Sequence, residues 1–126
     1  MPIIYPHEFI ARTAISSVKA EIAKSLNSNG FSQKDIAELM DSQISAVSQY
    51  INGQRGSSYP LSENTMNLVS AVSEAIRNEP SAELLKFGVY QICNKIIEEE
   101  FGYSFDENGD EELEESQYED NIDLSD

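Results

Sequence analysis

The chain has few of the residues from which enzymes and metal-binding proteins build their sites. It has one cysteine, Cys93, and one histidine, His7, and the two stand far apart in a chain of 126 residues. A single cysteine cannot form a disulfide within the chain, and it cannot supply a site made of several cysteines. We therefore interpret Cys93 as a small buried apolar residue and His7 as an ordinary residue of a first helical turn, and we expect no bound metal and no cofactor.

Long apolar runs and targeting signals are also absent. No stretch approaches the roughly 18 uninterrupted apolar residues that a membrane-spanning helix requires, and residues 1–6 lack the basic flank of a signal peptide. We expect a cytoplasmic protein with no membrane partner. The sequence contains no glycine-rich phosphate-binding loop and no cluster of metal ligands, so we expect that the protein is not an enzyme.

Basic residues are missing from the last part of the chain. The net charge of −15 opposes DNA binding, because such binding neutralises phosphates with Lys and Arg. However, residues 1–97 hold all eight bases and nine acids, whereas residues 98–126 hold fourteen acids and no base. We therefore assign residues 1–97 to one folded domain of nearly neutral charge. Residues 98–126 are expected to be an acidic, mostly disordered tail, since they have too little apolar surface to offset the entropy of ordering.

The acidic tail has three possible roles. Asp106–Asp110 superficially resembles a calcium-binding loop, but its glycine is the fourth residue where an EF-hand loop needs it sixth, so we do not expect calcium binding. The tail could serve only to keep the protein soluble. Alternatively, its acids could compete with DNA for the few cations of the domain and inhibit weak, non-specific binding. The sequence leaves these last two alternatives open.

Apolar residues recur every three or four positions in five segments, which predicts an all-α domain of five helices. Ser32 and Ser81 are expected to cap helices, and Gly30 is expected to end one. The expected helices span approximately residues 6–27, 32–40, 43–51, 62–77 and 81–102.

Residues 31–55 have the spacing of a helix-turn-helix unit. Two short helices that cross closely need a small residue at the crossing, and Ala37 stands there, with Val47 packing from the second helix. Asp41 falls in the tight turn between them, where a positive φ is needed. Gln43 is an imperfect cap for the second helix. The remaining apolar residues of the unit are Ile36, Met40, Tyr50 and Ile51.

This segment resembles archaeal DNA-binding regulators whose helix-turn-helix is of the phage-repressor type. The resemblance is carried by Phe31-Ser-Gln-x-x-Ile-Ala37 and by the run Ala-Val-Ser-Gln-Tyr-Ile-x-Gly-x-Arg-Gly at residues 46–56, and it extends more weakly over residues 6–97. It implies a dimeric transcription regulator in which the helices after the motif join two copies.

The chain departs from this family at several positions. Glycine is usual in the family where this chain has Asp41, an apolar residue is usual at Ser42, and a polar residue is usual at Ile44. Relatives also carry cysteine at the positions of His7 and Ile96, so any metal role in the family is not expected to extend to this chain.

In helix-turn-helix proteins the N-terminal part of the second helix enters the DNA major groove, and the first helix lies across the backbone. We expect a sequence-specific, double-stranded DNA-binding homodimer, and the alternative is a protein-interaction module or DNA mimic on the same scaffold. The residues expected to contact bases are Ile44, Ser45, Ser48 and Gln49, and those expected to hold phosphates are Gln33, Lys34 and Arg55.

Overall fold

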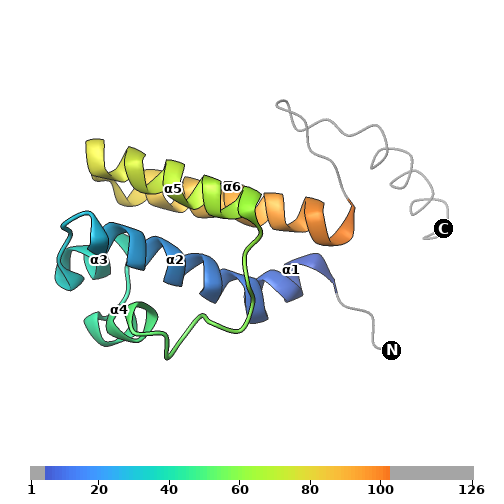
Figure 1. Cartoon of the computed structure of the whole chain (residues 1–126), viewed down its shortest axis with the longest axis horizontal. Helices are drawn as coiled ribbons and strands as arrows, with labels where there is room; N and C mark the ends of the chain where they lie inside the picture. The colour runs from blue at the N-terminus through green and yellow to red at the C-terminus, as the bar shows by residue number, and fades with distance from the viewer. Residues whose placement is uncertain (1–4, 103–126) are drawn as a thin grey trace, which may run out of the picture.

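The computed structural model describes residues 5–102, which form five helices and no strand (Figure 1). The first helix runs without a break through α1, the π-helical turn η1 and α2. The predicted all-α class with a helix-turn-helix is confirmed. The elements are α1 (Pro6–Phe9), η1 (Ile10–Ala14), α2 (Ile15–Ser28), α3 (Gln33–Met40), α4 (Ile44–Ile51), α5 (Glu63–Asn78) and α6 (Ala82–Phe101).

Three serines fix where helices begin. The hydroxyls of Ser32, Ser62 and Ser81 each accept a hydrogen bond from the backbone amide three residues later, at 3.1, 3.2 and 3.1 Å. Each bond satisfies one of the amides that has no partner within the helix, which stabilises the helix start by about 1 kcal/mol. The capping roles predicted for Ser32 and Ser81 are confirmed.

The π-helical turn η1 was not predicted from the sequence. The Ile15 amide donates to the Ile10 carbonyl, five residues back, in place of the usual four. Because this turn takes in one extra residue, Phe9 and Ala14 come onto one face although they are five residues apart. Phe9 thereby joins the apolar stripe of α2 and packs edge-on against Phe101 of α6, with ring centroids 5.7 Å apart.

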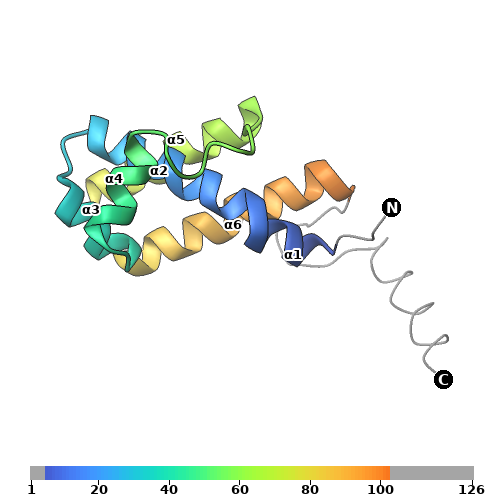
Figure 2. The same ribbon diagram turned by 90° about the horizontal axis from the view of Figure 1, so that it is seen from below.

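The helices pack in layers around α2. In Figure 1, α5 and α6 form one layer, α2 lies beneath them, and α4 lies on the far side of α2 from α5; Figure 2 shows the same arrangement from the α4 side. The core is continuous through all of these helices. No helix within residues 5–102 is long and apolar enough to cross a membrane. The fully buried side chains of the hydrophobic core include Val18, Ile22, Leu26, Ile36, Val47, Ile76, Ile92 and Ile96.

Cys93 is buried in this core on α6, as predicted. Burial raises the pKa of its thiol to about 11, although the nearby charge of Lys19 acts in the opposite direction. The thiol therefore stays protonated at neutral pH, which is the unreactive form of a cysteine.

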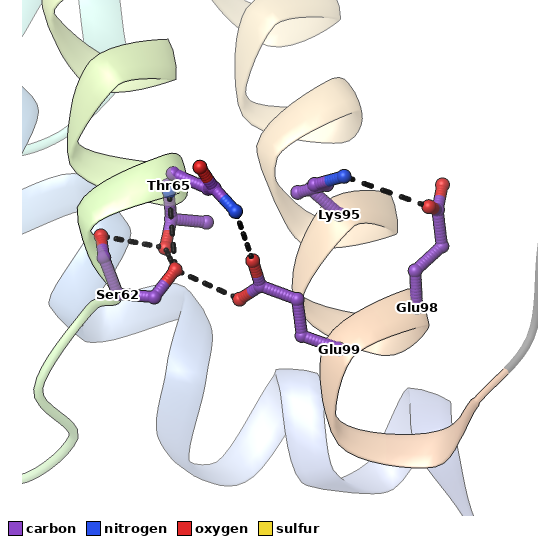
Figure 3. A network of polar contacts seen from close by, with 6 residues as sticks. Ser62, Thr65, Lys95, Glu98 and Glu99 are labelled. Carbon is purple, nitrogen blue, oxygen red and sulfur yellow. Dashed lines mark hydrogen bonds and ion pairs between the residues drawn. The ribbon is translucent and has the colours of Figure 1, made fainter.

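The acidic end of α6 forms part of the folded domain. Glu99 accepts hydrogen bonds from the Ser62 hydroxyl at 2.8 Å and from the Asn64 amide at 3.5 Å, which join the end of α6 to the start of α5 (Figure 3). The helix continues to Phe101, so the domain boundary expected after residue 97 lies within α6. The expected disordered tail otherwise lies outside the described residues, since residues 103–126 are not among them.

Tyr59 attaches the connection between α4 and α5 to the C-terminal end of α6. Its hydroxyl donates to Glu100 at 2.6 Å, its amide donates to the Ser17 hydroxyl at 3.3 Å, and its ring packs edge-on against Phe9. Burial, followed by the hydrogen bond to Glu100, raises the pKa of the Tyr59 hydroxyl above its usual range, so it remains a donor. The chain that leaves α4 is thereby held against α2 and α6.

Gly56 brings this connection into direct contact with α2. It has a φ of +79°, and a Cβ atom placed there would lie 2.7 Å from the Ala20 Cβ and also collide with the Ser16 carbonyl oxygen. Both the backbone conformation and the available space therefore require glycine.

Replacing Gly56 by alanine is expected to lower the free energy of unfolding by about 2–4 kcal/mol, since it adds a clash with backbone to an unfavourable φ. Gly53→Ala is the matched control, because Gly53 has a φ of +83° but no atom within 4 Å of an added Cβ. The control should lose only about 1 kcal/mol. Urea denaturation of both variants measures the difference, and equal losses would show that the contact with α2 carries no energy.

Candidate nucleic-acid interface

Helices α3 and α4 are joined by a tight turn at Asp41. Asp41 has a φ of 53°, and it is the only residue other than glycine with a positive φ among residues 5–102. The next amide, that of Ser42, donates to the Ala37 carbonyl at 2.9 Å and so closes the end of α3. Ala37 and Val47 are both buried, and α3 and α4 pack against each other. The positive φ expected at Asp41 is confirmed, and Ala37 and Val47 are buried as expected.

Helix α4 has one buried and one accessible face. Val47 and Tyr50 are buried and fix the helix on the core, with 0% and 5% of their surface exposed. The four residues expected to contact bases follow one another at helical spacing on the other face. Ile44 and Ser45 are exposed and Ser48 and Gln49 are half-buried.

The first turn of α4 has no side-chain cap. Gln43 occupies the cap position in an extended conformation, but its side chain makes no capping hydrogen bond. Ile44 follows and is 50% exposed. An exposed apolar residue at the start of a recognition helix is suited to contact with a thymine methyl group.

Arg55 is placed at the opposite end of α4. The backbone amides of Gln54 and Arg55 both donate to the Gln49 carbonyl, at 2.9 and 3.2 Å, so the chain folds back on the helix after Asn52. The Arg55 guanidinium lies 5.8 Å from the centre of the Tyr50 ring. This cation–π contact orients an otherwise exposed cation without neutralising it.

Gln33 and Lys34 form the first turn of α3. The Ser32 hydroxyl accepts a hydrogen bond from the Asp35 amide. The amides of Gln33 and Lys34 come before it in the first turn, where amides have no partner within the helix. Free amides and the positive end of the helix dipole favour a phosphate at such a position. Gln33 is half-buried and Lys34 is exposed, and both are accessible to a ligand.

Two carboxylates that were not expected near Lys34 from the sequence also border this region. Lys34, Ile44 and Ser45 line an open hollow between α3 and α4, together with Glu38 and Asp41. The two carboxylates oppose a phosphate near Lys34. Glu38 stands four residues after Lys34 on the same helix, and this spacing could have indicated from the sequence that its carboxylate lies near Lys34.

The structure brings the expected residues together as two groups. Lys34, Ile44 and Ser45 share the hollow between the helix starts, whereas Gln49 and Arg55 are linked through the backbone at the other end of α4. Residues 5–102 contain no group of three or more His, Cys, Asp or Glu side chains that could hold a metal ion.

Comparison with models of known protein families, with curated proteins and with solved structures finds no match to the chain. The resemblance to helix-turn-helix regulators therefore rests on the sequence pattern. It remains a prediction.

Replacing Asp41 by glycine is expected to raise the free energy of unfolding by about 0.5–1 kcal/mol, because glycine adopts a positive φ without strain. Asp41→Asn should change stability little, since asparagine tolerates the same conformation and differs only in charge. Thermal unfolding of the two variants separates the backbone effect from the charge effect. A glycine variant less stable than the wild type would show that the turn is not strained.

Proposed function

We propose that the protein is a cytoplasmic transcription regulator that binds double-stranded DNA sequence-specifically and uses α4 as its recognition helix. The observation that carries the proposal is the α3–turn–α4 unit, in which the buried Val47 and Tyr50 hold α4 on the core while its opposite face stays accessible. A helix presented in this way fits the major groove. Gln49 is suited to pair with adenine, and Ser45 and Ser48 can donate to or accept from several bases.

The charge of the interface limits the affinity of a single copy for DNA. Lys34 and Arg55 are the expected phosphate contacts, and Glu38 and Asp41 lie close to the first of them. Each phosphate contact adds only a modest, salt-dependent increment of affinity. We therefore propose that two copies act together and contact half-sites about 34 Å apart, which is one turn of DNA.

The layer of α5 and α6 is the proposed surface between the two copies. Phe87 and Tyr90 on α6 are 55% and 61% exposed, and their rings stack with centroids 6.4 Å apart. Beside them runs an apolar groove whose lining includes Leu68, Val72 and Leu84. Exposed aromatic residues next to an apolar groove are typical of protein interfaces.

A second candidate function has its own support. Glu38 and Asp41 place carboxylates beside the helix that would enter DNA, and the whole chain has a net charge of −15. Such a surface could bind a basic protein and act as an interaction module or a DNA mimic.

Selection of bound sequences from a random pool of duplex DNA tests the main proposal. The full chain and a chain ending at Gly102 are compared, because a cut after Ile97 would remove the hydrogen bonds of Glu99 and Glu100. Enrichment of a near-palindromic sequence supports the regulator. Failure of both forms to bind any DNA would overturn it and favour the interaction module.

Ser48→Ala and Gln49→Ala are expected to weaken binding to the selected site by about 1–3 kcal/mol while leaving non-specific binding nearly unchanged. Lys34→Ala and Arg55→Ala should weaken all sequences alike and reduce the salt dependence. Fluorescence anisotropy at several salt concentrations measures both effects. If the two pairs of variants behave identically, the assignment of base and phosphate contacts is wrong.

Phe87→Glu is expected to convert a homodimer to a monomer, since it places a charge in the proposed apolar interface. Lys24→Ala on α2 is the control, because Lys24 lies outside the layer of α5 and α6 and pairs only with Glu21 among the described residues. Sedimentation equilibrium at tens of micromolar gives the mass of each form without DNA. A wild-type chain that is entirely monomeric there would exclude the dimer.

A further inference from the structure

A second hollow lies on the other side of α3 from the one described above, where α2, α3 and α6 meet. We call it the α3–α6 hollow, and its volume is about 350 Å³. Its walls are mostly half-buried apolar side chains from all three helices. The lining residues are Ile15 and Lys19 from α2, Leu39 and Met40 from α3, Asp41, and Leu85, Lys86 and Val89 from α6.

Two lysines from separate helices border this apolar surface. Lys19 comes from α2 and Lys86 from α6, and neither forms an ion pair with any residue in the described part of the chain. By contrast, Lys24, Arg77 and Lys95 each pair with a glutamate three residues away on the same helix. The two lysines therefore border an apolar hollow without an ion-pair partner among residues 5–102.

The charge of Lys19 also acts on Cys93 of α6. It lowers the pKa of the Cys93 thiol, against the larger effect of burial. Asp41 is the one carboxylate among the lining residues, and it makes no ion pair with either lysine. The lining thus carries two positive charges and one negative charge.

We propose that the α3–α6 hollow binds a small amphipathic anion, with its apolar body against Leu39, Met40 and Leu85 and its carboxylate or similar group near Lys19 and Lys86. The volume lies at the lower end of the range of about 300–1,000 Å³ that small-molecule sites occupy. Apolar walls with a few polar groups that fix orientation are the usual composition of such sites.

Two other hollows of the described residues do not offer this combination. The groove between α5 and α6 is lined by apolar residues and Gln91 and has no charged side chain. The hollow between α3 and α4 contains one lysine but two carboxylates, Glu38 and Asp41. Of these three hollows, the α3–α6 hollow is the one whose lining has more positive than negative charges, which makes it complementary to an anion.

The position of this site connects it to the helix-turn-helix. Met40 is the last residue of α3 and Asp41 forms the turn that leads to α4, so a bound molecule would contact the joint between the two helices. Any effect of the ligand on DNA affinity would rest on the proposed function. Binding of a ligand in the hollow does not depend on that function, and the experiments that test it contain no DNA.

Methyl-labelled methionine provides a direct test of where a ligand binds. Met40 lines the hollow, whereas Met66 lies on α5 and does not. The full chain is titrated with 8-anilinonaphthalene-1-sulfonate, an apolar aromatic body with one anionic group. The Met40 methyl resonance should shift while that of Met66 stays in place. A Met40 signal that does not move, or equal shifts of both, overturns the proposal.

The contribution of the lysines is tested with matched variants. Lys19→Met and Lys86→Met should each weaken binding of the sulfonate about three-fold, the size expected for accessible charge pairs. Lys95→Met on α6 is the control and should leave the affinity unchanged. Neutral N-phenyl-1-naphthylamine should bind all forms alike. An anion site would be refuted if Lys95→Met and Lys86→Met weaken binding of the sulfonate equally. It would also be refuted if the lysine variants weaken binding of the neutral dye as much as that of the sulfonate.

A different occupant would give a different result. If the sulfonate leaves Met40 unchanged but a synthetic peptide of residues 103–126 added to the full chain shifts it, the hollow binds the acidic end of the chain. That outcome overturns the small-ligand proposal. Neither result depends on whether α4 binds DNA, so failure of this inference and failure of the proposed function are distinguishable.

Discussion

The apolar stripe of α2 is the surface on which the other helices pack. Val18, Ile22 and Leu26 are fully buried along it, and α3, α4, α5 and α6 all contact this helix. A side chain at such a junction touches several elements at once, so its loss leaves a cavity that no single neighbour can fill. The position of the helix-turn-helix relative to α5 is therefore set through α2, whereas α3 also contacts α6 directly.

This arrangement separates two surfaces with different chemistry. The accessible face of α4 is polar except for Ile44, and it lies on the far side of α2 from α5. The exposed aromatic residues Phe87 and Tyr90 belong to α6. A protein that binds DNA and a second copy of itself needs such a separation, because each surface must stay accessible while the other is covered.

The connection after α4 and the end of α6 stabilise one another. Tyr59 bonds to Glu100, and Ser62 bonds to Glu99, so residues that the charge pattern assigned to a tail hold the loop and the start of α5. These hydrogen bonds have charged acceptors, which makes them stronger than bonds between neutral groups. The acidic composition of residues 98–101 thus has a structural role within the fold.

The sequence alone determined the helices, their serine caps at Ser32 and Ser81, and the positive φ of Asp41, because each depends on side chains within about four positions. It also placed the polar face of α4, since helical spacing orients residues regardless of their surroundings. Only the tertiary structure decided what lies beside that face. The hollow that Lys34 shares with Ile44 and Ser45, the contact of Gly56 with α2, and the lysines that border the α3–α6 hollow all depend on how separate segments pack. No local pattern encodes such distances, because they are set by the shapes of side chains far apart in the sequence.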